Sequence, residues 1–92
     1  MLDGISLIKE PENCTSNYWL QTLILDISQS NQRDQILEVT NEAGYMTRPV
    51  WNPVHNLIPF KDCPRMELTG ALSLSQCLIN IPSSSGLVGA IL

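Results

Sequence analysis

An almost unbroken apolar run over residues 18–27 limits most strongly what this chain can fold into. The run is rich in aromatic and β-branched side chains, which favours a strand. A strand that is apolar on both faces is usually central in its sheet and covered on both sides. We therefore predict a central strand over residues 18–27, with the rings of Tyr18 and Trp19 in the core.

A helix is expected directly after this strand. Residues 28–43 carry apolar or small side chains at helical spacing, with Ser30 or Asn31 available as the N-cap and Asp34 in the first turn. Gly44 is expected to follow the helix in the left-handed conformation. The side chains on the predicted buried face are Ile36, Leu37, Val39, Thr40 and Ala43.

Strand and helix signals then alternate over residues 45–81. We predict a short strand over residues 45–50, a proline-stiffened loop over 51–62, a helix over 64–76 with Pro64 in its first turn, and a strand over 78–81. This order predicts the α/β (α+β) class: a small two-layer sandwich in which three main strands form a mostly antiparallel or mixed sheet packed with two helices.

The length of 92 residues suits one domain, which we place at residues 18–85. Residues 1–17 contain breakers and a polar run, so we interpret them as an irregular linker or entry segment. The short apolar patch Ile5-Ser6-Leu7-Ile8 is expected to anchor this segment on the core. The apolar residues 86–92 are expected to be a flexible or truncated tail.

Composition excludes several classes of function. The net charge is -4 and the five basic residues are scattered, which argues against a nucleic-acid partner. No apolar stretch approaches the roughly 20 residues that span a bilayer. The three cysteines, Cys14, Cys63 and Cys77, form neither a disulfide framework nor a zinc pattern, and we expect free thiols that act as small core hydrophobes in a reducing cytosol.

No catalytic motif stands out, and the only lysines, Lys9 and Lys61, have no setting that suggests a Schiff-base nucleophile. The informative segment is the loop over residues 48–60. The loop contains Arg48, whose guanidinium can hold a carboxylate or phosphate, and the imidazole of His55. It also contains aromatic rings that can stack on a sugar or base. The structural alternative is that Trp51 and Phe60 fill the core, His55 holds the turn by a backbone hydrogen bond, and Arg48 is a solvated charge.

Several separated stretches together resemble one family. They are Asn-Tyr-Trp-Leu at 17–20, Arg-Asp at 33–34, the run from Ala43 to His55 that contains R-P-V-W-N-P-V-H, C-P-R-M at 63–66, and L-I-N-I-P-S-S at 78–84. In this order and spacing they resemble the C-terminal part of the DegT/DnrJ/EryC1/StrS aminotransferases. These are pyridoxal-phosphate enzymes of fold type I that aminate nucleotide-linked keto sugars.

The resemblance implies a small C-terminal domain that covers the active-site cleft and is inactive alone. The family's Schiff-base lysine, pyridine-facing aspartate and most phosphate contacts lie upstream in the large domain, so no catalytic or metal residue is carried over. Contacts to the nucleotide sugar or amino donor are carried over to Arg48, Trp51, Asn52 and His55.

For the intact parent enzyme, the resemblance implies pyridoxal phosphate as cofactor, with none expected in this fragment. It implies a 4-keto sugar substrate, glutamate as amino donor by analogy with the family, and a role in surface polysaccharide or nonulosonic acid biosynthesis in a bacterial cytoplasm. The expected partners are the large domain and a second copy of the chain. The alternative interpretation is a free-standing small-molecule-binding or self-associating module without catalysis.

Overall fold

A four-stranded antiparallel sheet lies at the centre of the chain. The computed structural model describes residues 3–83, and its strand order is β1-β2-β4-β3. The predicted fold class is confirmed, with one strand more than the three expected. The elements are β1 (Ile5–Leu7), β2 (Gln21–Leu25), a 3₁₀ helix η1 (Ile27–Gln32), α1 (Arg33–Glu42), β3 (Arg48–Pro49), 3₁₀ helices η2 (Val54–Asn56) and η3 (Ile58–Phe60), α2 (Thr69–Cys77) and β4 (Leu78–Ile81).

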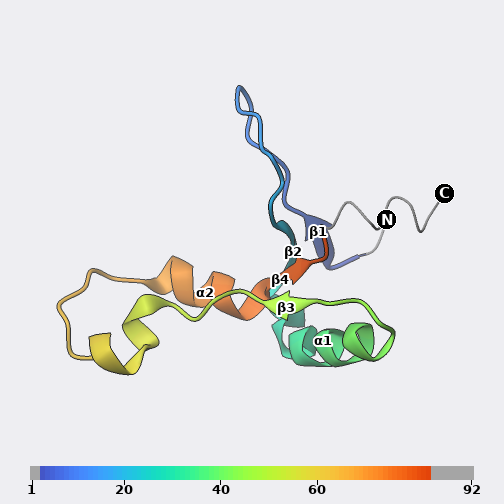
Figure 1. The fold of residues 1–92 in the computed structure, drawn as a ribbon. Coiled ribbons are helices and arrows are strands. Elements are labelled where there is room, and N and C mark those ends of the chain that lie inside the picture. Colours follow the sequence, from blue (N-terminus) through green and yellow to red (C-terminus); the bar gives the residue numbers. More distant parts are fainter. Residues whose placement is uncertain (1–2, 84–92) are drawn as a thin grey trace.

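Figure 1 shows that the chain is not compact. In this view helix α1 lies to the right of the small sheet, α2 and the turns η2 and η3 extend to the left, and residues 8–20 project from the sheet as an arm. The radius of gyration is 15.4 Å, whereas a compact domain of this length has about 12 Å. Side chains on such extended segments have few neighbours within the chain.

Strand β2 is shorter than predicted, although it lies inside the sheet between β1 and β4 as expected. The prediction that Tyr18 and Trp19 lie in the core is wrong, because both are exposed. The Ser16 Oγ accepts a hydrogen bond from the Tyr18 N–H, and the Asn17 Oδ1 accepts one from the Trp19 N–H, each at 3.0 Å. These local bonds take backbone donors that a longer strand would need for its ladder.

The segment expected to be an irregular linker contains strand β1. Ile5 pairs with Leu25 and Leu7 pairs with Leu23, and the Ile5 side chain packs on the core. The apolar patch therefore anchors the segment by sheet pairing at an edge. The division into an entry segment at 1–17, a domain at 18–85 and a tail at 86–92 stays a prediction, and the whole tail lies outside the described residues.

Helix α1 ends as predicted and begins differently. Gly44 has φ +95°, its N–H donates to the Asn41 carbonyl (3.0 Å), and the Tyr45 N–H donates to the Thr40 carbonyl (2.9 Å). This is the Schellman arrangement that a glycine after a helix favours. At the other end, residues 27–32 form a 3₁₀ helix first, so the N-cap is Gln32 rather than Ser30 or Asn31.

The buried face of α1 is narrower than the predicted one. Ile36 and Leu37 pack against the core, and Thr40 is half-buried. Val39 and Ala43 are exposed, because the sheet beneath the helix is too small to cover its whole apolar stripe. Arg33 joins the two helices through an Nη1–H donated to the Ser75 carbonyl at 2.6 Å.

Helix α2 begins at Thr69, five residues after the predicted start at Pro64. A start at Pro64 would make Cys63 the N-cap, and a thiol is a poor acceptor for the free N–H groups of a first turn. Strand β4 has the predicted bounds, whereas the strand predicted over residues 45–50 shrinks to Arg48–Pro49. Proline there is consistent with an edge strand.

The core is very small for a chain of this length. Within residues 3–83 its buried hydrophobic members are Leu25, Cys77 and Ile79. The expectation of core cysteines is confirmed for Cys77 and wrong for Cys14 and Cys63, which are exposed free thiols. The described residues include no helix of the length and apolarity needed to cross a bilayer.

Candidate functional site

An open cavity of about 730 Å³ lies beside strands β3 and β4. We call it the Arg48 cavity. Its walls come from the end of the arm, from the segment around β3, and from β4 and the residues after it. The lining residues are Leu20, Met46, Arg48, Pro49, Val50, Trp51, Asn52, Leu57, Asn80, Ile81, Pro82 and Ser83. Three of the four predicted substrate-binding residues therefore line one cavity: Arg48, Trp51 and Asn52.

A polar network at the end of α1 holds Arg48 in place. The Arg48 Nη1 donates hydrogen bonds to the Asn41 Oδ1 and to the Thr47 carbonyl, both at 2.7 Å. The Asn41 amide in turn donates to the Thr47 Oγ1 at 2.9 Å. The Thr47 side chain is buried and also shares a hydrogen bond with the Thr40 hydroxyl. Arg48 is thus an exposed charge, as in the structural alternative, and two hydrogen bonds hold its side chain in position.

Trp51 and Asn52 follow β3 on an exposed loop. The Trp51 side chain is 77% exposed, so the alternative in which it fills the core is wrong. Phe60 is also exposed, which excludes the same alternative for that ring. A flat aromatic face that lines a cavity and is open to solvent is suited to stack on a ring of a ligand.

His55 does not join these three residues. It lies half-buried in η2 and lines a second cavity of about 360 Å³, between the 3₁₀ turns and α2. The turn around it is closed by backbone bonds, from the Asn56 N–H to the Pro53 carbonyl (2.9 Å) and from the Leu57 N–H to the Val54 carbonyl (3.0 Å). These backbone bonds leave the imidazole no necessary part in holding the turn.

Sequence reasoning missed Asn80, which lines the Arg48 cavity from β4. The Thr22 Oγ1 donates a hydrogen bond to the Asn80 Oδ1 at 2.8 Å, which ties its amide to the neighbouring strand. A signal was present in the sequence, because asparagine is depleted in strands and here stands between isoleucines.

The charge of the Arg48 cavity differs from that of the whole chain. Among the described residues that line it, Arg48 is the only charged one and none is an aspartate or glutamate, although the chain carries a net charge of -4. A guanidinium without a carboxylate neighbour favours a ligand with a phosphate or carboxylate group. The site is therefore suited to bind an anion that also carries a ring.

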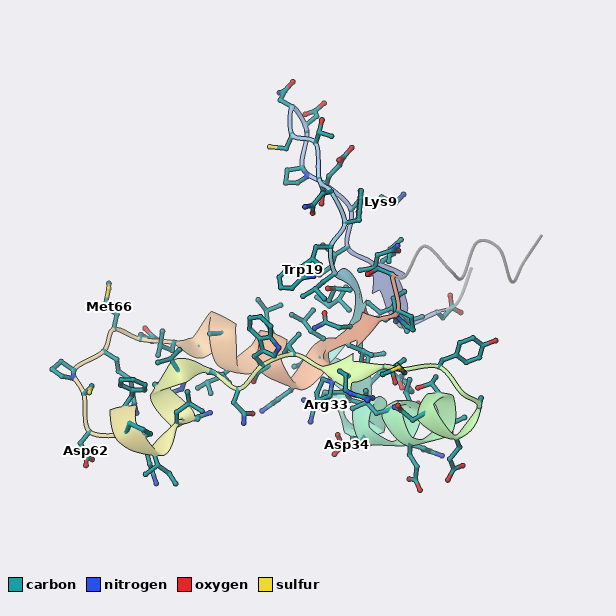
Figure 2. The ribbon with its side chains drawn as sticks, viewed as in Figure 1. Lys9, Trp19, Arg33, Asp34, Asp62 and Met66 are labelled. Atoms are coloured by element: carbon teal, nitrogen blue, oxygen red, sulfur yellow. The ribbon has the colours of Figure 1, made fainter. Side chains whose placement is uncertain are left out.

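The described residues do not fit a pyridoxal-phosphate site. A Schiff-base lysine must be desolvated or otherwise activated, and both Lys9 and Lys61 are exposed. Figure 2 shows Lys9 on the arm, with its side chain away from the sheet. Among residues 3–83 there is also no group of three His, Cys, Asp or Glu side chains that could hold a metal ion.

Comparison with known proteins gives a partial match to a sugar-modifying enzyme. GDP-perosamine synthase of Caulobacter vibrioides is 29% identical to this chain over 73 residues, which cover 79% of the chain and 20% of that protein. The chain thus spans about a fifth of the length of this curated relative. No model of a known protein family matches the chain. The similarity supports the resemblance to sugar aminotransferases that the sequence stretches indicate.

Proposed function

We propose that this chain is the C-terminal small domain of a pyridoxal-phosphate-dependent aminotransferase that aminates a nucleotide-linked 4-keto sugar. The observation that carries the proposal is the partial match: most of this chain is similar to about a fifth of GDP-perosamine synthase. The Arg48 cavity adds a binding surface of fitting chemistry, because it combines a cation, amides and an open indole ring. Arg48, Trp51 and Asn52 contact the nucleotide sugar or the amino donor in this proposal, and His55 contributes from the second cavity.

The domain contributes binding and not the catalytic lysine. Both of its lysines are exposed on loops, so the cofactor chemistry belongs to the large domain of the parent enzyme. The amino donor of that enzyme is glutamate, and its place is the bacterial cytoplasm. Its product serves the synthesis of surface polysaccharide or nonulosonic acid.

The exposed apolar side chains favour a partner that covers them in the parent enzyme. Clustered exposed apolar side chains mark an interface, and the segment between β3 and α2 exposes several large ones. In the proposal the large domain and a second copy of the chain cover them. They are Trp51, Val54, Leu57, Ile58, Phe60 and Met66.

The same exposure favours the second candidate function, a self-associating module without catalysis. The two candidates differ in one observable: an aminotransferase domain restores an enzyme that lacks it, whereas an unrelated module does not. Self-association measured by analytical ultracentrifugation is expected in both cases, so it does not separate them.

A chimera tests the proposal directly. In GDP-perosamine synthase, the stretch of 73 residues similar to this chain is replaced by the corresponding residues of this chain. We expect the chimera to bind pyridoxal phosphate and to form GDP-perosamine at a measurable rate, because the transplanted segment rebuilds the same part of the active-site cleft. Product formation is followed by liquid chromatography with mass spectrometry.

The control is a second chimera of equal length in which the residues of the transplanted segment are shuffled. A first chimera that folds and binds the cofactor, but forms no more product than the shuffled control, would contradict the proposed function.

A further inference from the structure

The strand register places three polar side chains in one row across the sheet. Thr22 of β2 lies opposite Asn80 of β4, and Asn80 lies opposite Arg48 of β3. Directly opposite residues of antiparallel strands point to the same face, with Cβ atoms about 5 Å apart. The row therefore ends at the Arg48 cavity, which Asn80 and Arg48 both line.

The hydrogen bond from Thr22 determines which end of the Asn80 amide is left for a ligand. The Thr22 hydroxyl donates to the Asn80 Oδ1 at 2.8 Å, so the acceptor end of the amide is engaged. The Nδ2 end carries two N–H donors. Within residues 3–83 no buried side-chain nitrogen or oxygen lacks a hydrogen-bond partner. The Nδ2 group, which makes no bond to another described residue, is therefore accessible to solvent or to a ligand.

Arg48 lies opposite Asn80 in the sheet and lines the same cavity. Its Nη1 is bound to Asn41 and Thr47, and the other guanidinium N–H groups make no hydrogen bond within the described part of the chain. Two donor groups on neighbouring strands, one of them cationic, line a cavity to which residues 3–83 contribute no carboxylate. Such a pair is complementary to the oxygens of one anionic group.

We propose that Asn80 is a specificity-determining residue of the Arg48 cavity, oriented by Thr22, and that its amide and the Arg48 guanidinium together bind one oxyanion of the ligand. The inference deepens the proposed function and rests on it for the identity of the ligand. A phosphate of the nucleotide sugar and a carboxylate of the amino donor share the required chemistry. The stacking surface of Trp51 in the same cavity favours the nucleotide.

The test is a nuclear magnetic resonance titration of the ¹⁵N-labelled full chain with GDP, with glutamate, and with inorganic phosphate. We expect the Asn80 side-chain NH₂ signals and the Trp51 indole N–H signal to shift together with GDP. A shift of the Asn80 signals with glutamate and not GDP assigns the oxyanion to the amino donor. A shift with inorganic phosphate that equals the GDP shift, with no change at Trp51, would overturn the assignment of a nucleotide.

Asn80→Asp is the decisive substitution, because it keeps the side-chain shape and replaces the donors with a negative charge. We expect it to weaken GDP binding at least about a hundredfold, since a hydrogen bond to a charged group is lost and a repulsion is added. Asn56→Asp is the matched control. This substitution adds the same charge at an exposed position outside the lining of the Arg48 cavity. We expect the variant to bind GDP with nearly the affinity of the unsubstituted chain.

The orienting role of Thr22 has its own test. Thr22→Val removes the hydroxyl and keeps the branched shape that a strand favours, so it should weaken GDP binding about tenfold. Thr22→Ser keeps the hydroxyl and should restore the affinity. Equal affinities of the valine and serine variants would remove Thr22 from the proposal.

The outcomes separate this inference from the proposed function. Loss of GDP binding in Asn80→Asp together with an inactive chimera would support the oxyanion site. It would overturn the proposal that the chain is an aminotransferase domain. An active chimera together with unchanged GDP binding in Asn80→Asp, or no Asn80 shift at millimolar GDP or glutamate, would overturn the role of Asn80 alone.

Discussion

Replacing Ile79 with alanine is expected to remove between about two fifths and nearly all of the free energy of unfolding of this chain. Ile79 is fully buried in β4, opposite Leu23 of β2 and Pro49 of β3, and it belongs to a core of very few side chains. An isoleucine-to-alanine change in a core costs about 2–5 kcal/mol. A domain of this size has a free energy of unfolding of about 5–10 kcal/mol, and the small core places this chain at the low end.

Urea denaturation followed by circular dichroism measures this effect. Ile58→Ala is the matched control, because that side chain is 86% exposed and its removal should change stability by less than about 0.5 kcal/mol. Equal urea midpoints for the two variants would show that β4 does not carry the core.

Replacing Trp51 with alanine in the GDP-perosamine synthase chimera is expected to lower product formation by about ten- to a hundredfold. Stacking of a ring on an aromatic side chain contributes about 1–3 kcal/mol, and each 1.4 kcal/mol corresponds to about a tenfold change. The melting temperature should hardly move, because the Trp51 side chain is largely exposed.

Trp19→Ala is the control for this substitution. Trp19 is also exposed, but it lies on the arm and does not line the Arg48 cavity, so its removal should leave the rate unchanged. A rate for Trp51→Ala equal to that of Trp19→Ala would show that the cavity does not bind substrate.

His55→Ala in the same chimera tests the second cavity. An unchanged rate of product formation in this variant would remove His55 from the proposed substrate-binding residues.

The elements with strong local signals could be predicted from the sequence. Gly44 marks the end of α1 because few other residues adopt its backbone conformation, and Pro82 limits β4 because proline cannot continue a ladder. Strand β1 could not be predicted, since a strand of three residues depends on its partner β2 more than on its own composition. Burial at Tyr18 and Trp19 was predicted wrongly because an apolar run does not show whether the rest of the chain reaches it.

Sequence also predicts only those cavity-lining residues that lie close together along the chain. Arg48, Trp51 and Asn52 are adjacent in sequence, so a search for unusual residue types in one loop finds them together. Asn80 is distant in the sequence and enters the cavity only through the pairing of β3 with β4. The resemblance places His55 in the same set because it ends the motif R-P-V-W-N-P-V-H, whereas in the structure the 3₁₀ turn at Val54–Asn56 puts it at the second cavity.

The central claim is that this chain contributes binding surface and that the catalytic lysine lies elsewhere. The most direct test is incubation of the chain with stoichiometric pyridoxal phosphate, followed by an absorbance spectrum, borohydride reduction and peptide mapping. We expect the spectrum of the free cofactor and no saturable modification. A stable shifted band that reduction traps on Lys9 or Lys61, in a ratio of one cofactor per chain, would show that the chain holds its own catalytic site and would contradict the claim.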